Sequence, residues 1–427
     1  MAKITIWQRI SSFFIALRLG FFLAFRQIWR VNIWTTILII FIMMFTFLNL
    51  VVVSGILVGL IEGATNAVRE RVIGELYVSN LNEKKYIERS QDIINVLKSI
   101  PEVTSYSARY AEGGIVTANY KTKKKVTDLD DNAATVIVGI DPIMEDKASN
   151  LSKFIVEGKY LDPDDYDKVL LGSNLLLKYL SFDAPGLGAL ENVEIGTKVR
   201  INIGESEREV TVKGILKGKA DEIDRRVFFV DSQLRGLIGR TDYNVDEIMI
   251  RIKDDKDVLN VKRALLSINA DQYAKIQTFE EGQPKFLKDI KVTFNILGNV
   301  ISSIGLVVAS ITIFIVIFIN AITRRKYIGI LKGIGVHSIA IEFAYILQSM
   351  FYAIFGTALG IIFVFSFLKP YIDVHPIDFP FSDGILVATF SGTLNRIIVL
   401  FIATLIAGYI PAKIVVRQNT LDAILGR

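Results

Sequence analysis

The sequence predicts an α-helical membrane protein with four transmembrane helices and a large α+β extracytoplasmic domain, in which a ferredoxin-like subdomain carries an inserted β-rich subdomain. Three observations lead to this prediction. The 427 residues are 51% hydrophobic with a mean hydropathy of +0.42, which is unusual for a soluble protein of this size. The apolar residues gather in blocks of about 20, the length that crosses a bilayer core of roughly 30 Å. The excess of basic over acidic residues lies beside these blocks.

Charge is distributed unevenly along the chain. Residues 63–292 hold 35 Lys and Arg against 38 Asp and Glu, a net charge of −3, whereas the remainder holds 14 against 6, a net charge of +8. Positive charge beside apolar blocks is typical of membrane topology, so we expect no nucleic-acid partner despite the pI of 9.0. The chain has no cysteine and two histidines, which excludes a disulfide framework and argues against a histidine-based metal site.

The first expected element is an amphipathic helix within residues 1–32, lying on the cytoplasmic membrane surface. This segment has five basic residues and no acidic residue, and large apolar side chains recur between them at helical spacing. A signal peptide is the alternative, but no small-residue cleavage site follows the segment.

Four transmembrane helices follow, and their apolar blocks contain few polar residues. We expect them at residues 33–61, 293–322, 339–368 and 393–412.

Basic residues concentrate before the first span, after the second and after the fourth. The positive-inside rule therefore places both termini in the cytoplasm of a multi-pass cell-membrane protein. The tail 413–427 and the loop 323–338 are then cytoplasmic, and residues 62–292 and the loop 369–392 lie outside.

Glycines four residues apart occur in the first and third spans. Small residues at this spacing let helices approach closely, so we expect these positions to pack helices and to favour a dimer built there. The residues are Gly55, Gly59, Gly356 and Gly360.

The polar region 62–292 has a recognisable organisation. Residues 88–99 and 255–268 have the apolar spacing of surface helices, and each segment lies between two strand-like runs. Two β-α-β units at the two ends of a domain suggest one ferredoxin-like subdomain. Mostly β patterns separated by turn residues lie between them, so we expect the middle to be an inserted β-rich subdomain.

The chain contains no recognisable catalytic motif. No G-x-x-x-x-G-K-[ST] loop occurs, and the glycines at 329, 333 and 335 follow an apolar helix rather than a strand, so they do not form a phosphate loop. We therefore expect a non-catalytic chain. The short loop 323–338 is basic and contains these three glycines. A loop of this size cannot fold alone, so it either packs on its own helix ends or docks on a cytoplasmic partner. A purely topogenic role would explain the basic residues but not the glycines.

This loop resembles the R-x-E-I-G-I-L-[KR]-A-[IL]-G-A signature of the MacB/LolC/FtsX-type ABC transporter permeases. Tyr327 stands where that family usually has glutamate. Three further segments resemble the family in the same order along the chain: residues 17–30, residues 169–175, and Pro411-Ala412-Lys413 followed by residues 419–425, in which Asn419-Thr420 replaces the usual Asp-Pro.

The resemblance implies a permease subunit that works with a separate ABC ATP-binding subunit. That partner would bind ATP and Mg, so we expect no cofactor in this chain. The other partners implied are the lipid bilayer, a second permease copy or a homologous permease, and an outer adaptor protein. Movement of the outer domain would serve export or extraction of a lipoprotein, lipid, peptide or drug-like substrate. A division-type regulator of cell-wall hydrolases and a membrane-anchored receptor without ATPase are the alternatives.

We expect the loop to bind the ATPase, with apolar side chains entering a groove, because each exposed ion pair contributes only about 0–1 kcal/mol. The expected coupling residues are Arg324, Arg325, Ile328, Gly329, Ile330, Leu331, Lys332, Gly333, Ile334 and Gly335.

Overall fold

The computed structural model describes residues 6–30, 33–121, 131–180, 188–379, 382–384 and 386–417. The chain divides into two compact units. The membrane unit comprises Met1–Gly59, Val292–Ile377 and Gly384–Arg427, and the α/β domain comprises Leu60–Lys291 and Asp378–Asp383. The motif expected at residues 419–425 lies outside the described residues.

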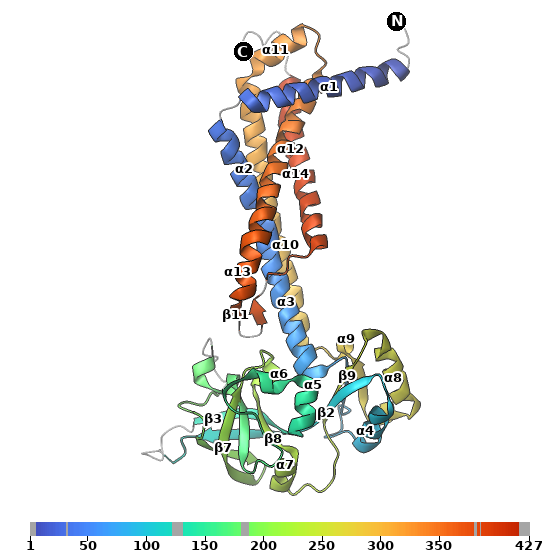
Figure 1. The fold of residues 1–427 in the computed structure, drawn as a ribbon, viewed down its shortest axis with the longest axis vertical. Coiled ribbons are helices and arrows are strands. Elements are labelled where there is room, and N and C mark those ends of the chain that lie inside the picture. The colour runs from blue at the N-terminus through green and yellow to red at the C-terminus, as the bar shows by residue number, and fades with distance from the viewer. Residues whose placement is uncertain are drawn as a thin grey trace. The chain divides into compact units, whose positions relative to one another are not determined.

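Four helices in the described ranges are long and apolar enough to cross a membrane (Figure 1). Each contains one predicted span and is longer than predicted. They are Ile33–Ile73, formed by α2 (Ile33–Leu48) and α3 (Ser54–Val68) with π-helical turns at Asn49–Val53 and Arg69–Ile73; α10 (Lys285–Thr323); Ser338–Val374, formed by α12 (Ser338–Phe363), a π-helical turn at Val364–Leu368 and α13 (Lys369–Val374); and α14 (Phe390–Val416).

The first long helix continues past residue 61, the predicted end of the first span, to Ile73. No proline lies between residues 61 and 74, and none of the described residues before Gly74, whose φ is +77°, has a positive φ. Backbone hydrogen bonding therefore continues until that glycine, regardless of the change from apolar to polar side chains.

Helix α12 packs against three neighbours in the membrane unit: α1 (Ile6–Arg30), α2 and α14. Glycines mark each contact. A Cβ added at Gly20 of α1 would lie 2.8 Å from the carbonyl oxygen of Ala340, and one added at Gly408 of α14 would lie 2.9 Å from Cβ of Ser349. At these contacts the helices approach too closely for any larger residue.

The predicted glycine pairs take part in packing within one chain. A Cβ at Gly356 would lie 3.0 Å from the carbonyl oxygen of Ile40 in α2, and one at Gly360 would collide with the ring of Phe47. In the first span, Gly55 accepts a hydrogen bond of 3.1 Å from the amide of Val387, and Gly59 is buried. The expectation that these pairs favour a seam between two copies is corrected for Gly356 and Gly360, because the structure fills the space beside them with α2.

The α/β domain contains the predicted ferredoxin-like subdomain. Its strands are β1 (Leu76–Ser79), β2 (Val103–Ala118), β9 (Glu247–Ile252) and β10 (Lys275–Thr278), and its helices are α4 (Ser90–Ser99) and α8 (Val258–Ser267). The strands pair antiparallel in the order β10-β1-β9-β2, which is the ferredoxin-like arrangement of two split β-α-β units.

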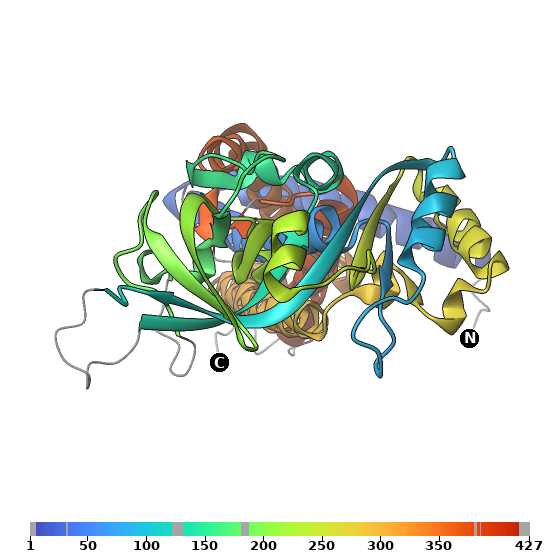
Figure 2. The ribbon, with the colours of Figure 1, turned by 90° about the horizontal axis from the view of Figure 1, so that it is seen from below.

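The inserted subdomain is a closed β-barrel, seen from below in Figure 2. Its ring runs β2–β3–β8–β5–β7–β6 and returns to β2, and β4 (Ile155–Gly158) pairs with β7. The other ring strands are β3 (Asp131–Ile140), β5 (Lys168–Gly172), β6 (Lys198–Ile203), β7 (Ser206–Leu216) and β8 (Arg226–Val230).

Strand β2 belongs to both subdomains. Residues from Val103 to Arg109 pair with β9, and residues from Tyr110 to Ala118 pair with β3. The two subdomains therefore share a continuous strand rather than a flexible linker.

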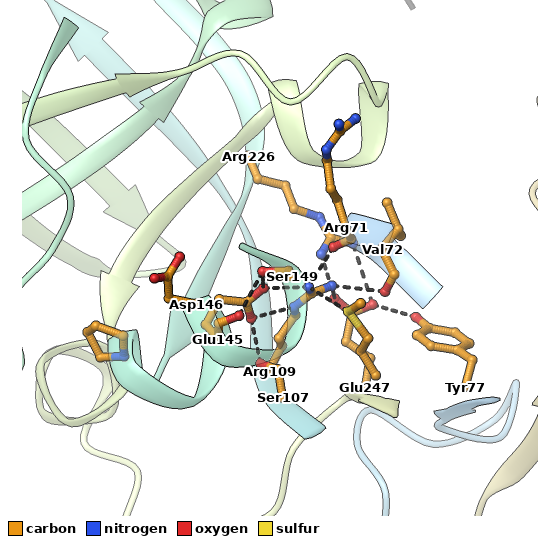
Figure 3. A network of polar contacts seen from close by, with 12 residues as sticks. Arg71, Val72, Tyr77, Ser107, Arg109, Glu145, Asp146, Ser149, Arg226 and Glu247 are labelled. Carbon is orange, nitrogen blue, oxygen red and sulfur yellow. Dashed lines mark hydrogen bonds and ion pairs between the residues drawn. The ribbon is translucent and has the colours of Figure 1, made fainter. Parts of the chain in front are cut away.

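A buried arginine lies where β2 passes from one subdomain to the other (Figure 3). Arg109 is fully buried and forms a bidentate ion pair with Glu145 of α5 (Pro142–Ser149), with N–O distances of 2.8 and 2.6 Å. Its guanidinium also donates to the carbonyl oxygens of Val72 at 3.0 Å and Arg71 at 2.7 Å. These carbonyls belong to the last turn of the first long helix, so Arg109 caps that helix from inside the domain.

A second buried carboxylate extends this network. Glu247 accepts hydrogen bonds from Arg226 at 2.5 Å and from the hydroxyl of Tyr77. Burial acts to raise the pKa of Glu247, but the charges of Arg226 and Arg109 outweigh it and lower that pKa to about 2. Burial opposes ionisation of Glu145 too, and Arg109 again outweighs it, so the pKa of Glu145 lies below its usual value. Both carboxylates are therefore ionised at neutral pH.

Substituting Gly356 tests the close packing of α12 on α2. We expect Gly356→Ala to lower the free energy of unfolding by about 1–3 kcal/mol, because the new methyl group overlaps backbone atoms of α2. Gly298→Ala is the matched control, because a Cβ there would lie 3.4 Å from Leu57, which is ordinary van der Waals contact. Denaturant titration in detergent micelles measures both, and equal effects would contradict the packing described.

Substituting Arg109 tests the capping network. Arg109→Met leaves Glu145 charged and unpaired in the interior, so we expect the surrounding strands and helix end to lose about 3–5 kcal/mol of protection. Hydrogen–deuterium exchange of residues 66–73 and 103–118 in the full chain measures this loss. Lys84→Met removes an exposed ion pair with Glu88 and should leave exchange nearly unchanged, because solvent screens the pair. Similar exchange in the two variants would show that the buried pair does not hold the helix end.

Candidate coupling site between the second and third membrane helices

The segment between α10 and α12 contains a helix rather than the predicted loop. Helix α11 (Arg325–Gly333) begins directly after Arg324, whose φ of −103° and ψ of 13° separate it from α10. Its apolar residues have helical spacing, but the helix has only nine residues, and a segment this short cannot be distinguished from a loop by its sequence pattern. The predicted loop 323–338 is corrected accordingly.

Gly335 explains where α11 ends. Its φ is +94°, in the left-handed region that favours glycine. The amide of Gly335 donates to the carbonyl of Lys332 at 3.0 Å, and the amide of Val336 donates to the carbonyl of Leu331 at 2.9 Å. This pair of bonds is a Schellman motif, and it satisfies carbonyls at the helix end. Helix α12 begins three residues later, with the His337 ring accepting from the Ile339 amide.

One face of α11 is fixed to the membrane unit. Ile328 is 3% exposed and belongs to the core formed by α2, α10, α12 and α14, and Leu331 packs against the same core. Gly329 is buried. The ammonium of Lys332 donates to the carbonyl oxygen of Val416 at 3.0 Å, at the carboxyl end of α14. The expectation that Ile328 enters a partner's groove is therefore wrong, because its own helices enclose that side chain.

The opposite face of α11 exposes three large side chains. Tyr327 is 69% exposed, Ile330 is 51% exposed and Ile334 is 73% exposed. At 100° per residue these positions fall within about 60° of one another around the axis, so they form one stripe, which we call the α11 stripe. A Cβ added at Gly333 would meet no atom within 4 Å, so the surface beside the stripe is open.

The basic residues at the start of α11 differ in exposure. Lys326 is exposed, whereas Arg324 and Arg325 are half-buried. Sequence reasoning included Ile330 and Ile334 but omitted Tyr327 from the predicted set. The signal that identifies Tyr327 is its spacing of three and seven residues from the two isoleucines, which becomes informative only once the segment is known to be helical.

Comparison with known proteins identifies the two halves of the chain. A model of the MacB-like periplasmic core domain matches residues 41–268, which is more than half of the chain, and a model of the FtsX-like permease C-terminal domain matches residues 299–420.

Individual relatives are distant. An uncharacterized ABC transporter permease of Methanocaldococcus jannaschii is 21% identical over 278 residues, which are 64% of this chain and 65% of that protein. The macrolide export ATP-binding/permease protein MacB of Agrobacterium fabrum is 26% identical over 198 residues, which are 44% of this chain and 28% of that protein. The chain thus spans less than two thirds of the length of these relatives.

Among solved structures, the periplasmic region of MacB from Actinobacillus actinomycetemcomitans matches half of this chain and 92% of that structure, at 15% identity and a TM-score of 0.34. The extracellular domain of the ABC-type transporter YknZ from Gram-positive bacteria matches 48% of this chain at 14% identity and a TM-score of 0.31. On the strength of the two domain matches in sequence order, this chain belongs to the MacB/FtsX-type family of ABC transporter permeases.

Proposed function

We propose that this permease works with a separate ATP-binding subunit, which docks on α11 from the cytoplasm and drives movement of the α/β domain for export or extraction of a substrate. The candidate substrates are a lipoprotein, a lipid, a peptide or a drug-like molecule. The observation that carries the proposal is the α11 stripe: three large side chains are exposed on a helix whose other face is held in the membrane unit. A helix fixed in this way transfers a displacement to the bundle instead of absorbing it.

The energetics favour docking through the stripe rather than through charge. Burying an isoleucine contributes about 1.5–3 kcal/mol, whereas an exposed ion pair contributes about 0–1 kcal/mol. Ile330 and Ile334 therefore provide most of the affinity, and the basic residues orient the partner. A purely topogenic role needs the basic residues but gives no reason for the exposed isoleucines.

The proposed topology rests on the basic residues at the end of the membrane unit that contains α11. Arg324, Arg325, Lys326 and Lys332 lie at or within α11, and Lys413 and Arg417 lie near the end of α14. Basic residues concentrate on the cytoplasmic side of membrane proteins, so this end faces the cytoplasm in our proposal. ATP and Mg bind to the partner subunit, and an outer adaptor is a further candidate partner of the α/β domain.

A second copy of the permease is the other proposed partner. Helix α10 is the least covered of the four long helices. Of its most apolar 18 residues, 17% are buried, against 33–39% in the other three helices. Its exposed isoleucines include residues spaced seven, four and seven apart, which is the spacing of a helix-pairing seam: Ile304, Ile311, Ile315 and Ile322.

Charged substitutions on α11 test the docking proposal. We expect the double variant Ile330→Asp/Ile334→Asp to weaken binding of the ATP-binding subunit at least tenfold, because it removes apolar area worth more than about 1.4 kcal/mol. Lys326→Ala should change the affinity less than threefold. The ATP-binding subunit is first identified by affinity purification from native membranes, and binding is then measured with the permease in nanodiscs. Unchanged affinity of the double variant, with the protein still folded, would exclude α11 as the docking site.

Cysteine crosslinking tests the second copy. Because the chain has no native cysteine, Ile311→Cys introduces a lone thiol on α10. We expect it to crosslink to the same position in another copy in membranes. Leu359→Cys on α12, which is also exposed, is the matched control and should remain uncrosslinked. Equal crosslinking at both positions would indicate random collision, and none at Ile304, Ile311 or Ile315 would exclude an α10 seam.

A further inference from the structure

A polar cavity lies among three helices of the membrane unit. Its volume is about 380 Å³, and it is lined by the first membrane helix around the start of α3, by α10 and by α14. This volume falls within the range of about 300–1,000 Å³ that small-molecule sites occupy. The polar residues that line it are Ser54, Asn295, Asn299, Ser302, Asn395 and Arg396.

Arg396 is the charged group of this cavity. It lies in the second turn of α14 and is half-buried. Among the residues that the structure describes, no acidic side chain lines the cavity and no charged group faces the guanidinium. By contrast, Lys369 in the same unit is paired with Asp373 at 2.8 Å. A guanidinium held partly out of water without a counter-charge is costly, and in a membrane helix such a residue marks a functional site.

The cavity lies where the apolar parts of the helices end. Residues 397–412 of α14, residues 292–323 of α10 and residues 33–61 of the first helix carry no charged side chain. Arg396 and Asn295 stand at or near the ends of the uncharged stretches of their helices, and Ser54 lies 21 residues from the start of its own, which is about 32 Å of helix. Ser54 and Ser302 are joined by a hydrogen bond of 2.8 Å. Such a position corresponds to the interface between hydrocarbon and lipid headgroups.

The lining is suited to an anion that carries an apolar chain. A guanidinium can bind two phosphate oxygens at once, and the amide groups of the asparagines can donate to others. Leu57 and Val399 border the same cavity and offer apolar contacts next to the polar groups. A cation would be repelled by Arg396, and an uncharged headgroup would leave it unpaired.

We propose that this cavity binds the phosphate group of an anionic amphiphile, with Arg396 as its counter-charge and Asn299 as a hydrogen-bond donor. The amphiphile is a phospholipid of the bilayer or the phospholipid-like part of a transported molecule, since both carry a phosphodiester beside acyl chains. The inference adds a substrate chemistry to the proposed function, but lipid binding can be measured without the ATP-binding subunit. Failure of the lipid-binding proposal therefore leaves the proposed docking of the ATP-binding subunit intact, and the reverse also holds.

Native mass spectrometry of the purified full-length permease tests the proposal, with phosphatidylglycerol and diacylglycerol as probes. We expect phosphatidylglycerol to be retained at one strong site, and Arg396→Gln to weaken it about tenfold. Arg396→Lys should retain part of the binding, because it keeps the charge and loses the paired geometry. Lys369→Gln, at a basic residue that already has a partner, should leave retention unchanged.

Three results would overturn the proposal. Equal retention by the parent protein and Arg396→Gln would remove Arg396 from the site. Equal retention of diacylglycerol would show an apolar groove that does not recognise phosphate. Displacement of phosphatidylglycerol by millimolar inorganic phosphate would show a site for free anions. If Arg396→Gln does not fold, Asn299→Leu is the variant to measure, and we expect it to weaken phosphatidylglycerol retention about threefold to tenfold. Unchanged retention in Asn299→Leu would also count against the proposal.

Discussion

Close approach of helix backbones is the constraint on which the membrane unit depends. Lipid tails are as apolar as the side chains that face them, so burial of apolar surface gives little drive for helices to associate inside a bilayer. Dispersion contacts and weak hydrogen bonds must hold the bundle, and these require short distances between backbones. Gly20, Gly356, Gly360 and Gly408 provide those distances on α12 and on the helices around it. The placement of α11 follows from the same constraint, because Ile328 is enclosed only when α2, α10, α12 and α14 converge.

The α/β domain solves a different problem, in water. Its two subdomains have separate apolar cores, and a third apolar cluster packs barrel residues such as Val138 and Phe228 against the end of the first long helix and Phe279. The shared strand β2 supplies a covalent connection, and Arg109 joins that strand to α5 and to the end of the first long helix. A buried ion pair adds little net stability compared with an apolar packing, but it tolerates few alternative geometries. The network therefore serves to define how these elements meet.

The sequence was sufficient for the features that depend on composition and periodicity. The four spans, the ferredoxin-like subdomain and the presence of a β-rich insertion follow from apolar blocks, helical spacing and strand alternation. Helix ends were less predictable: the helix predicted to stop at residue 61 continues to Ile73, because its end depends on the positive φ of Gly74 rather than on polarity. The orientation of α11 required the structure. Ile328 and Ile330 are chemically identical, and only the convergence of distant helices decides that one is buried and the other exposed. The same holds for Arg109 and Arg396, whose surroundings come from segments far apart in the chain.

The path of the chain through β2 and β9 has a consequence for how such a protein diversifies. The barrel is inserted between Arg109 and Asp246, and the amide of Asp246 donates to the carbonyl of Arg109 at 2.9 Å. The insertion thus leaves and rejoins the ferredoxin-like subdomain at adjacent positions, where the amide of Ala111 also donates to the carboxylate of Asp246 at 2.8 Å. Residues can be gained, lost or replaced within it while the two flanking strands keep their register. Evolution can therefore remodel the barrel without altering the ferredoxin-like subdomain that is joined to the membrane helices, which makes this architecture modular.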